Sequence, residues 1–178
     1  MKKLGCIIYC VVVLALIACS QTKTTATATE LKNFPINNLE GVISKSDVQL
    51  DKEISSDGNG SLKIIATKPM VVLLYEVKDI DIENARLIYQ ARVRTENIEG
   101  QAFLEMWCHF PGKGEFFSRS LQSPLTGTTD WTTVETPFFL QKGENPDYVK
   151  LNLVINGKGT AWIDDISLTK RALQENVD

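Results

Sequence analysis

Regular alternation of apolar and polar residues in several short segments restricts this chain to β-structure. From residue 102 to residue 110 every second side chain is apolar, namely Ala102, Leu104, Met106, Cys108 and Phe110. Successive side chains of a β-strand point to opposite faces, so these five predict one buried face. The alternation places the other side chains on the outer face: Phe103, Glu105, Trp107 and His109.

Two further segments show the same period of two. In 87–94 the inward set is Leu87, Tyr89, Ala91 and Val93, and the outward set is Gln90, Arg92 and Arg94. In 150–156 the inward set is Leu151, Leu153 and Ile155, and the outward set is Lys150, Asn152, Val154 and Asn156. Glycine-containing segments separate these runs, among them Glu99-Gly100. Pro111-Gly112-Lys113-Gly114 predicts a hairpin that brings 115–121 back beside 102–110. The best helical candidate is the tail 170–177. The pattern predicts an all-β sandwich or barrel.

The segment from Gly159 to Leu168 predicts a closing strand with an irregular centre. Its large apolar side chains would face the core, while the neighbouring acids Asp164 and Asp165 interrupt the alternation. A half-buried carboxylate needs hydrogen bonds or a cation to offset its desolvation. A β-bulge or a bound metal ion would supply them.

The first 18 residues have the three regions of a secretory signal peptide: a basic start, a short apolar run and small residues before a processing point. The sequence Leu16-Ile17-Ala18-Cys19 resembles the lipobox of bacterial lipoprotein precursors. That resemblance implies cleavage before Cys19 and lipidation of its thiol and its new amino group. The alternative is an ordinary signal peptide or a membrane anchor, although the run is short for a spanning helix of about 20 residues.

We therefore predict a signal peptide at 1–18, a lipidated Cys19 with a Thr-rich flexible tether at 19–32, one domain at 33–170 and a tail at 171–178. Loss of Lys2 and Lys3 leaves 17 basic against 22 acidic residues, a net charge of −5. Such a surface repels the phosphates of nucleic acids. Cys108 is the one cysteine left without lipid in the mature chain, so it is either a buried apolar residue or a free thiol.

Several short motifs follow one another in a characteristic order along the domain. They are Leu39-Glu40, Asp57-Gly58-Asn59-Gly60-Ser61-Leu62-Lys63-Ile64, Tyr89-Gln90-Ala91-Arg92-Val93, Thr129-Asp130-Trp131-Thr132 and Ala161-Trp162-Ile163-Asp164-Asp165-Ile166-Ser167-Leu168. This order resembles the galactose-binding-like jelly rolls, and more narrowly the carbohydrate-binding modules of bacterial xylanases and glucanases. The resemblance implies a jelly-roll β-sandwich of two antiparallel sheets with one face open to a sugar chain.

The same resemblance implies a structural calcium ion. In those modules calcium often joins an acid near the first strand to an aspartate in the last strand, which corresponds here to Glu40 and to Asp164 or Asp165. Calcium prefers several hard oxygen ligands, and carboxylates with backbone carbonyls meet that need. The alternative is that Asp164 caps a bulge and Asp165 is solvated.

Sugar recognition requires an aromatic surface for a pyranose ring and planar polar groups for its hydroxyls. The outward sets offer both, and the predicted ligand site consists of Trp107, Glu105, His109, Gln90, Arg92, Asn152 and Asn156. The alternative is an ordinary solvated sheet face on which Trp107 covers a loop. We interpret Trp131 and Trp162 as packing residues.

Two other function classes stay open at this point. A glycosidase or lyase needs paired acids or a His/Tyr/Arg constellation, but His109 and Glu105 are about 13 Å apart along one strand. An envelope interaction module would bind a protein through edge strands or through the loop 118–129. The sequence favours a lipoprotein of the bacterial cell envelope, facing the periplasm or the cell surface, whose domain binds an oligo- or polysaccharide without catalysis.

Overall fold

The computed structural model describes residues 28–173, and nearly all of its regular structure is β-strand. The predicted signal peptide 1–18, Cys19 and the first part of the predicted tether lie outside the described residues, as does 174–178 of the predicted tail. Within the described part of the chain, no helix has the length and apolar character needed to cross a membrane.

Eight strands and one short 3₁₀ helix follow in order along the chain. They are β1 (Thr29–Phe34), η1 (Lys45–Asp47), β2 (Gln49–Asp51), β3 (Ser61–Ala66), β4 (Met70–Lys78), β5 (Ala85–Phe110), β6 (Gly114–Arg119), β7 (Leu125–Leu140) and β8 (Tyr148–Ala172). Strands β5 and β8 are far longer than an ordinary strand of five or six residues.

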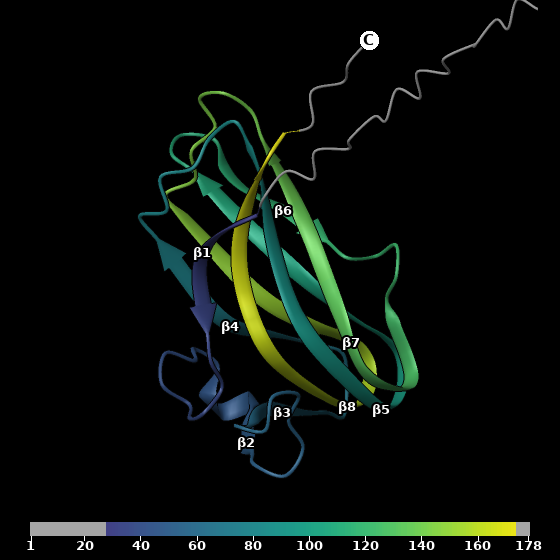
Figure 1. Cartoon of the computed structure of the whole chain (residues 1–178). Helices are drawn as coiled ribbons and strands as arrows, with labels where there is room; N and C mark the ends of the chain where they lie inside the picture. Colours follow the sequence, from purple (N-terminus) through teal and green to yellow (C-terminus); the bar gives the residue numbers. More distant parts are fainter. Residues whose placement is uncertain (1–27, 174–178) are drawn as a thin grey trace, which may run out of the picture.

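These two long strands pair with each other along almost their whole length and run through both layers of a sandwich. In the first layer, the N-terminal half of β5 lies between β7 and the C-terminal half of β8, and β1 and β3 extend that layer. In the second layer, the order is β4, β8, β5, β6. Figure 1 shows the two layers and the curve, at the lower right, where β5, β7 and β8 pass from one to the other.

The bend between the layers is built on glycines of β5 and β8. Gly100 pairs with Gly157, and the φ angles of these residues are +113° and +152°. A Cβ at Gly157 would lie 1.8 Å from the carbonyl oxygen of Glu99, so only glycine permits this approach of the two backbones. The segments around Gly100 and Gly157 were predicted to separate strands. In the structure, β5 and β8 continue through them and bend.

The inward sets predicted from the alternation form the core between the layers. All five apolar residues of the set in 102–110 are buried, as are the inward residues of 87–94 and 150–156. They belong to one apolar cluster, which explains how a domain with no disulfide among its described residues keeps its two sheets together. Cys108 is buried in this cluster, and burial raises the pKa of its thiol to about 12, as expected of a packing residue.

The predicted domain boundaries need correction at both ends. Residues 29–32, predicted as part of the tether, lie in β1, where Lys32 and Phe34 pair with Leu168 and Ile166 of β8. Residues 170–172 of the predicted helical tail continue β8. The hairpin predicted at Pro111–Gly114 is confirmed, because Phe110 pairs with Gly114 and the N–H of Lys113 donates to the carbonyl of Phe110.

Candidate functional site

The outer surface of the second layer brings together three rows of side chains from β8, β5 and β6. Register sets the rows, because cross-strand partners of an antiparallel pair lie on the same face. The rows are Asn152–Glu105–Arg119, Lys150–Trp107–Phe117 and Tyr148–His109–Glu115. We call these nine residues, with Val71 and Leu73 of the neighbouring β4, the Trp107 face.

Glu105 is the centre of the first row and is only 3% exposed. Its Oε1 accepts hydrogen bonds from Trp107 Nε1 at 2.7 Å and Asn152 Nδ2 at 3.0 Å, and its Oε2 accepts one from Arg119 Nε at 2.6 Å. Burial alone would raise the pKa of this carboxyl, but the three hydrogen bonds and the Arg119 charge hold the pKa below its ordinary value. Glu105 is therefore a fixed anion that orients its three neighbours.

Glu105→Gln is expected to lower the free energy of unfolding at neutral pH by about 1.5–3 kcal/mol, the usual contribution of hydrogen bonds to a charged group. Folding lowers the pKa of Glu105, so its stabilising effect is complete above its unfolded pKa of 4.5 and is lost as pH falls through the lower folded pKa. The difference between wild type and variant should shrink in acid. Urea unfolding across this range measures it, with the exposed Glu40→Gln as control, and a difference independent of pH would contradict the assignment.

The second row is an aromatic platform. The rings of Trp107 and Phe117 lie 5.0 Å apart between centroids at an interplanar angle of 48°. The guanidinium of Arg119 lies 4.3 Å from the centroid of the Phe117 ring, a cation–π distance. Trp107 is half-buried, while Phe117 is 50% exposed. The platform is therefore apolar, partly open to solvent and held in place from below by Glu105.

The third row forms a chain of polar contacts. Oε1 of Glu115 accepts hydrogen bonds from Lys150 Nζ at 2.6 Å and from the Tyr148 hydroxyl at 3.1 Å. The hydrogen bond from Lys150 holds the pKa of Glu115 below its ordinary value. The Tyr148 ring stacks on His109 at 4.6 Å and 2°, and Nδ1 of His109 lies 2.6 Å from a carboxylate oxygen of Asp147. Glu115 is therefore paired with the cation of Lys150 from the second row.

A pocket of about 330 Å³ lies on the Trp107 face, lined by residues of all four strands, among them Leu73, Trp107, Lys150 and Asn152. Asn152 is 5% exposed, and its amide donates to Glu105. Its Oδ1 is buried and has no hydrogen-bond partner among the described residues. Buried carbonyl oxygens normally accept a hydrogen bond, so this atom is an acceptor without its donor.

Solved structures with a similar arrangement of strands include carbohydrate-binding modules. The CBM22-1 xylan-binding domain of Xyn10C from Paenibacillus barcinonensis has a TM-score of 0.60 at 12% identity, covering 83% of this chain and 98% of that one. A family 16 carbohydrate-binding module has a TM-score of 0.57 at 16% identity, covering 79% and 99%. The chain is a jelly-roll β-sandwich. At this identity the likeness concerns the fold, and it confirms the predicted fold class.

A third similar structure is the CBM22-1–GH10 chain of Clostridium thermocellum xylanase 10B, solved with xylohexaose. The TM-score is 0.58 at 12% identity over 84% of this chain, which spans only 30% of that longer protein. No protein-family profile matches the sequence, and no curated protein matches it either.

The jelly roll brings together four of the seven predicted ligand residues: Trp107, Glu105, His109 and Asn152. Asn156 is exposed and pairs with Gln101 at the bend, about 13 Å along β8 from Asn152. Gln90 and Arg92 lie in the first layer, where they pair with Glu135 and Thr133 of β7. Their grouping with Trp107 was wrong, because the two halves of β5 face the core from opposite layers and their outer faces point apart.

Seven residues of the Trp107 face were missed by the sequence reasoning: Phe117, Arg119, Glu115, Lys150, Tyr148, Val71 and Leu73. The signal for three of them was present in the predicted hairpin. A turn that pairs Phe110 with Gly114 fixes the register of β5 and β6. In that register His109, Trp107 and Glu105 pair with Glu115, Phe117 and Arg119, respectively. Lys150 was recognised as outward but was not considered as a ligand residue.

The two adjacent aspartates lie at a β-bulge near the centre of β8. Two steps along β5, from Gln90 to Arg92, match three along β8, and Asp165 has a φ of +49°. Asp164 is buried, and its oxygens accept hydrogen bonds from the N–H groups of Asp165 at 2.8 Å and Ser56 at 2.9 Å. These bonds offset the desolvation of Asp164, as the bulge alternative requires.

The predicted metal ligands are only partly brought together. Oxygens of Asp164 and Asp165 lie within 4.8 Å of each other and of an oxygen of Asp57, whereas exposed Glu40 does not belong to this group. Asp57, from the turn before β3, therefore takes the place that was predicted for Glu40. Three carboxylate oxygens are a donor set that suits calcium. Calcium binding stays a prediction.

Proposed function

We propose that the Trp107 face binds a neutral carbohydrate chain without chemical reaction. The observation that carries this proposal is the pocket beside the Trp107 ring, which Asn152 lines and whose polar groups Glu105 holds in fixed orientations. A sugar stacked on Trp107 would present hydroxyl groups along its edge toward the polar side chains that line the pocket, among them Lys150, Glu115 and Asn152. Apolar stacking together with a few fixed polar groups is the usual composition of a ligand site.

The charges of the face favour a neutral ligand. Arg119 is paired with Glu105 and Lys150 with Glu115, in both cases at 2.6 Å, so neither cation is free to bind an acidic sugar. The whole chain carries a net charge of −3, which repels a polyanion at long range. A uronic acid would have to displace Glu105 or Glu115 from its partner.

The same two carboxylates favour binding over hydrolysis. A glycosidase needs one carboxylic acid whose pKa is raised, so that it can protonate the leaving group. The pKa values of both Glu105 and Glu115 are lowered instead, each beside a hydrogen-bonded cation. They are suited to fixing the orientation of neighbouring side chains and not to donating a proton.

A comparison of glycans tests the proposal. We expect the protein to bind neutral xylo- or gluco-oligosaccharides in isothermal titration, with weaker or no binding to an oligogalacturonate of equal length. Binding that is restricted to the acidic glycan would exclude the proposed chemistry of the face.

We further propose that the domain is held at a membrane of the bacterial cell envelope through Cys19. Support comes from the lipobox-like Leu16-Ile17-Ala18-Cys19 after a short apolar run. Lipidation of both thiol and amine anchors stably, whereas one acyl chain binds a membrane only marginally. Mass spectrometry of the purified protein should find acyl groups on an N-terminal Cys19, and Cys19→Ala should leave the precursor unprocessed. An unmodified or uncleaved wild-type N-terminus would contradict the proposal.

A further inference from the structure

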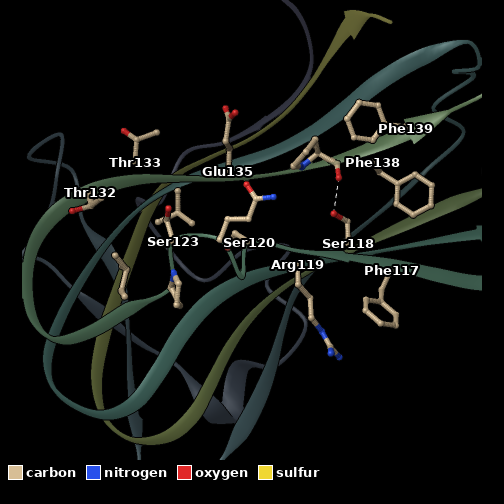
Figure 2. A pocket seen from close by; sticks show the side chains of 15 residues that line it. Phe117, Ser118, Arg119, Ser120, Ser123, Thr132, Thr133, Glu135, Phe138 and Phe139 are labelled. Carbon is tan, nitrogen blue, oxygen red and sulfur yellow. Dashed lines mark hydrogen bonds between the residues drawn. The ribbon is translucent and has the colours of Figure 1, made fainter.

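A groove of about 870 Å³ lies along the edge of the sandwich, between β6 and β7. These are edge strands of different layers, because β6 pairs with β5 in the second layer and β7 pairs with β5 in the first. Ser118 joins the two edges, since its hydroxyl donates to the carbonyl of Pro137 and lies 2.8 Å from the Thr136 hydroxyl. Figure 2 shows Ser118 directed toward β7 across the groove.

The lining of the groove is mainly apolar, with Phe138, Phe139 and two prolines beside a set of polar side chains. Leu125 and Val134, both members of the core cluster, form part of the floor. Six hydroxyl or amide side chains line it: Ser118, Ser120, Gln122, Ser123, Thr132 and Thr133. Its volume falls in the range of about 300–1,000 Å³ that is typical of small-ligand sites.

The chemistry of these walls suits a neutral, hydroxyl-bearing ligand. Hydroxyl and amide groups both donate and accept, which matches sugar hydroxyls. The hydroxyls of Ser118 and Ser120 already bond within the protein, so Gln122, Ser123, Thr132 and Thr133 are the groups left for a ligand. Arg119 is the cation among the lining residues, and its Nε is held by Glu105. The carboxylate of Glu135 on the opposite wall is exposed and forms no ion pair among the described residues, which further disfavours an anion.

Two residues of β6 connect the groove with the Trp107 face. Arg119 lines both the groove and the pocket beside Trp107, and Phe117 lines the groove while its ring packs against Trp107. In Figure 2 both side chains point from β6 away from β7, toward the outer surface of the second layer. The two sites therefore lie on adjacent sides of the same edge strand, β6.

We propose that the groove between β6 and β7 holds a side branch of the glycan whose main chain lies on the Trp107 face. The ligand is then a branched neutral polysaccharide, and the two sites contribute to one affinity. This inference rests on the proposed function, because the branch is delivered by a main chain already bound beside Trp107.

The test compares two probes with the same backbone: linear xylohexaose and an arabinose-branched xylohexaose, each titrated into the mature protein in detergent. Wild type is expected to bind the branched probe about tenfold more tightly. Ser123→Trp and Thr133→Trp fill the groove from its two walls and should abolish that preference while leaving the affinity for the linear probe unchanged. The exposed Thr67→Trp, in the turn between β3 and β4, is the matched control.

The outcomes separate this inference from the function it rests on. Equal affinity of wild type for both probes overturns the branch site alone, as does a preference that survives both groove-filling substitutions. The groove would then belong to another occupant, such as an extended peptide. Absence of binding to either probe, with the fold intact by circular dichroism, overturns the branch site, and absence of binding to cellohexaose as well overturns the glycan proposal itself.

Discussion

Trp107→Ala is expected to weaken the binding of a neutral oligosaccharide by roughly 30- to 150-fold, which corresponds to about 2–3 kcal/mol. The indole is the largest surface on which a sugar ring can stack, and its ring is kept in place by Phe117 at 5.0 Å and by the hydrogen bond to Glu105. The substitution also removes a donor from the buried carboxylate of Glu105. Isothermal titration with the linear probe measures the change.

Trp107→Phe separates these two effects. It keeps an aromatic ring over the pocket but loses the indole N–H that donates to Glu105 at 2.7 Å. An intermediate loss of about tenfold is expected, together with a lowered midpoint of urea unfolding. Ile65→Ala, an exposed apolar residue of β3 in the first layer, is the control and should bind like wild type. If Trp107→Ala retains wild-type affinity while folded, the ligand does not lie on this face.

Side-chain alternation was sufficient to predict which residues form the core. The period of two in 102–110 reflects local strand geometry, so Leu104, Met106 and their neighbours could be placed without knowing any tertiary contact. The same logic put Trp107 on the outer face, where it lies. What alternation cannot report is how deeply an outward residue is covered, because that depends on neighbouring strands. Glu105 points outward and is still buried, since Trp107, Asn152 and Arg119 enclose it.

Assigning outward residues to one surface required knowledge that the local pattern does not contain. Gln90 and Trp107 each belong to the outward set of their own segment, and both were correctly predicted to point away from the core. The error arose because Gly100 was interpreted as part of a turn between neighbouring strands. Instead, β5 continues through it and changes layers, so that Gln90 and Trp107 lie on opposite outer faces of the sandwich. A glycine that ends a strand and one that bends it look alike in the sequence.

Gly157→Ala is expected to destabilise the protein severely, by more than about 4 kcal/mol, because the added methyl group has no space. Its Cβ would lie 1.8 Å from the carbonyl oxygen and 2.8 Å from the carbonyl carbon of Glu99, both backbone atoms that no rotamer change can move. The φ of +152° adds strain of its own. Relief would require β5 and β8 to separate at the bend, which would alter the register that sets Asn152 beside Glu105.

Gly112→Ala is the matched control, because Gly112 also has a positive φ, +74°, but no atom outside its own chain neighbours lies within 4 Å of the position of its Cβ. That substitution should cost about 1–2 kcal/mol, the conformational strain of an L-residue alone. Urea unfolding of the two variants and of wild type measures the difference in the free energy of unfolding. If Gly157→Ala does not fold while Gly112→Ala does, the prediction is also confirmed. Similar stabilities of the two variants would show that the close approach of the backbones at the bend does not exist. The two layers would then be connected in another way, and the rows of the Trp107 face could not be aligned as described.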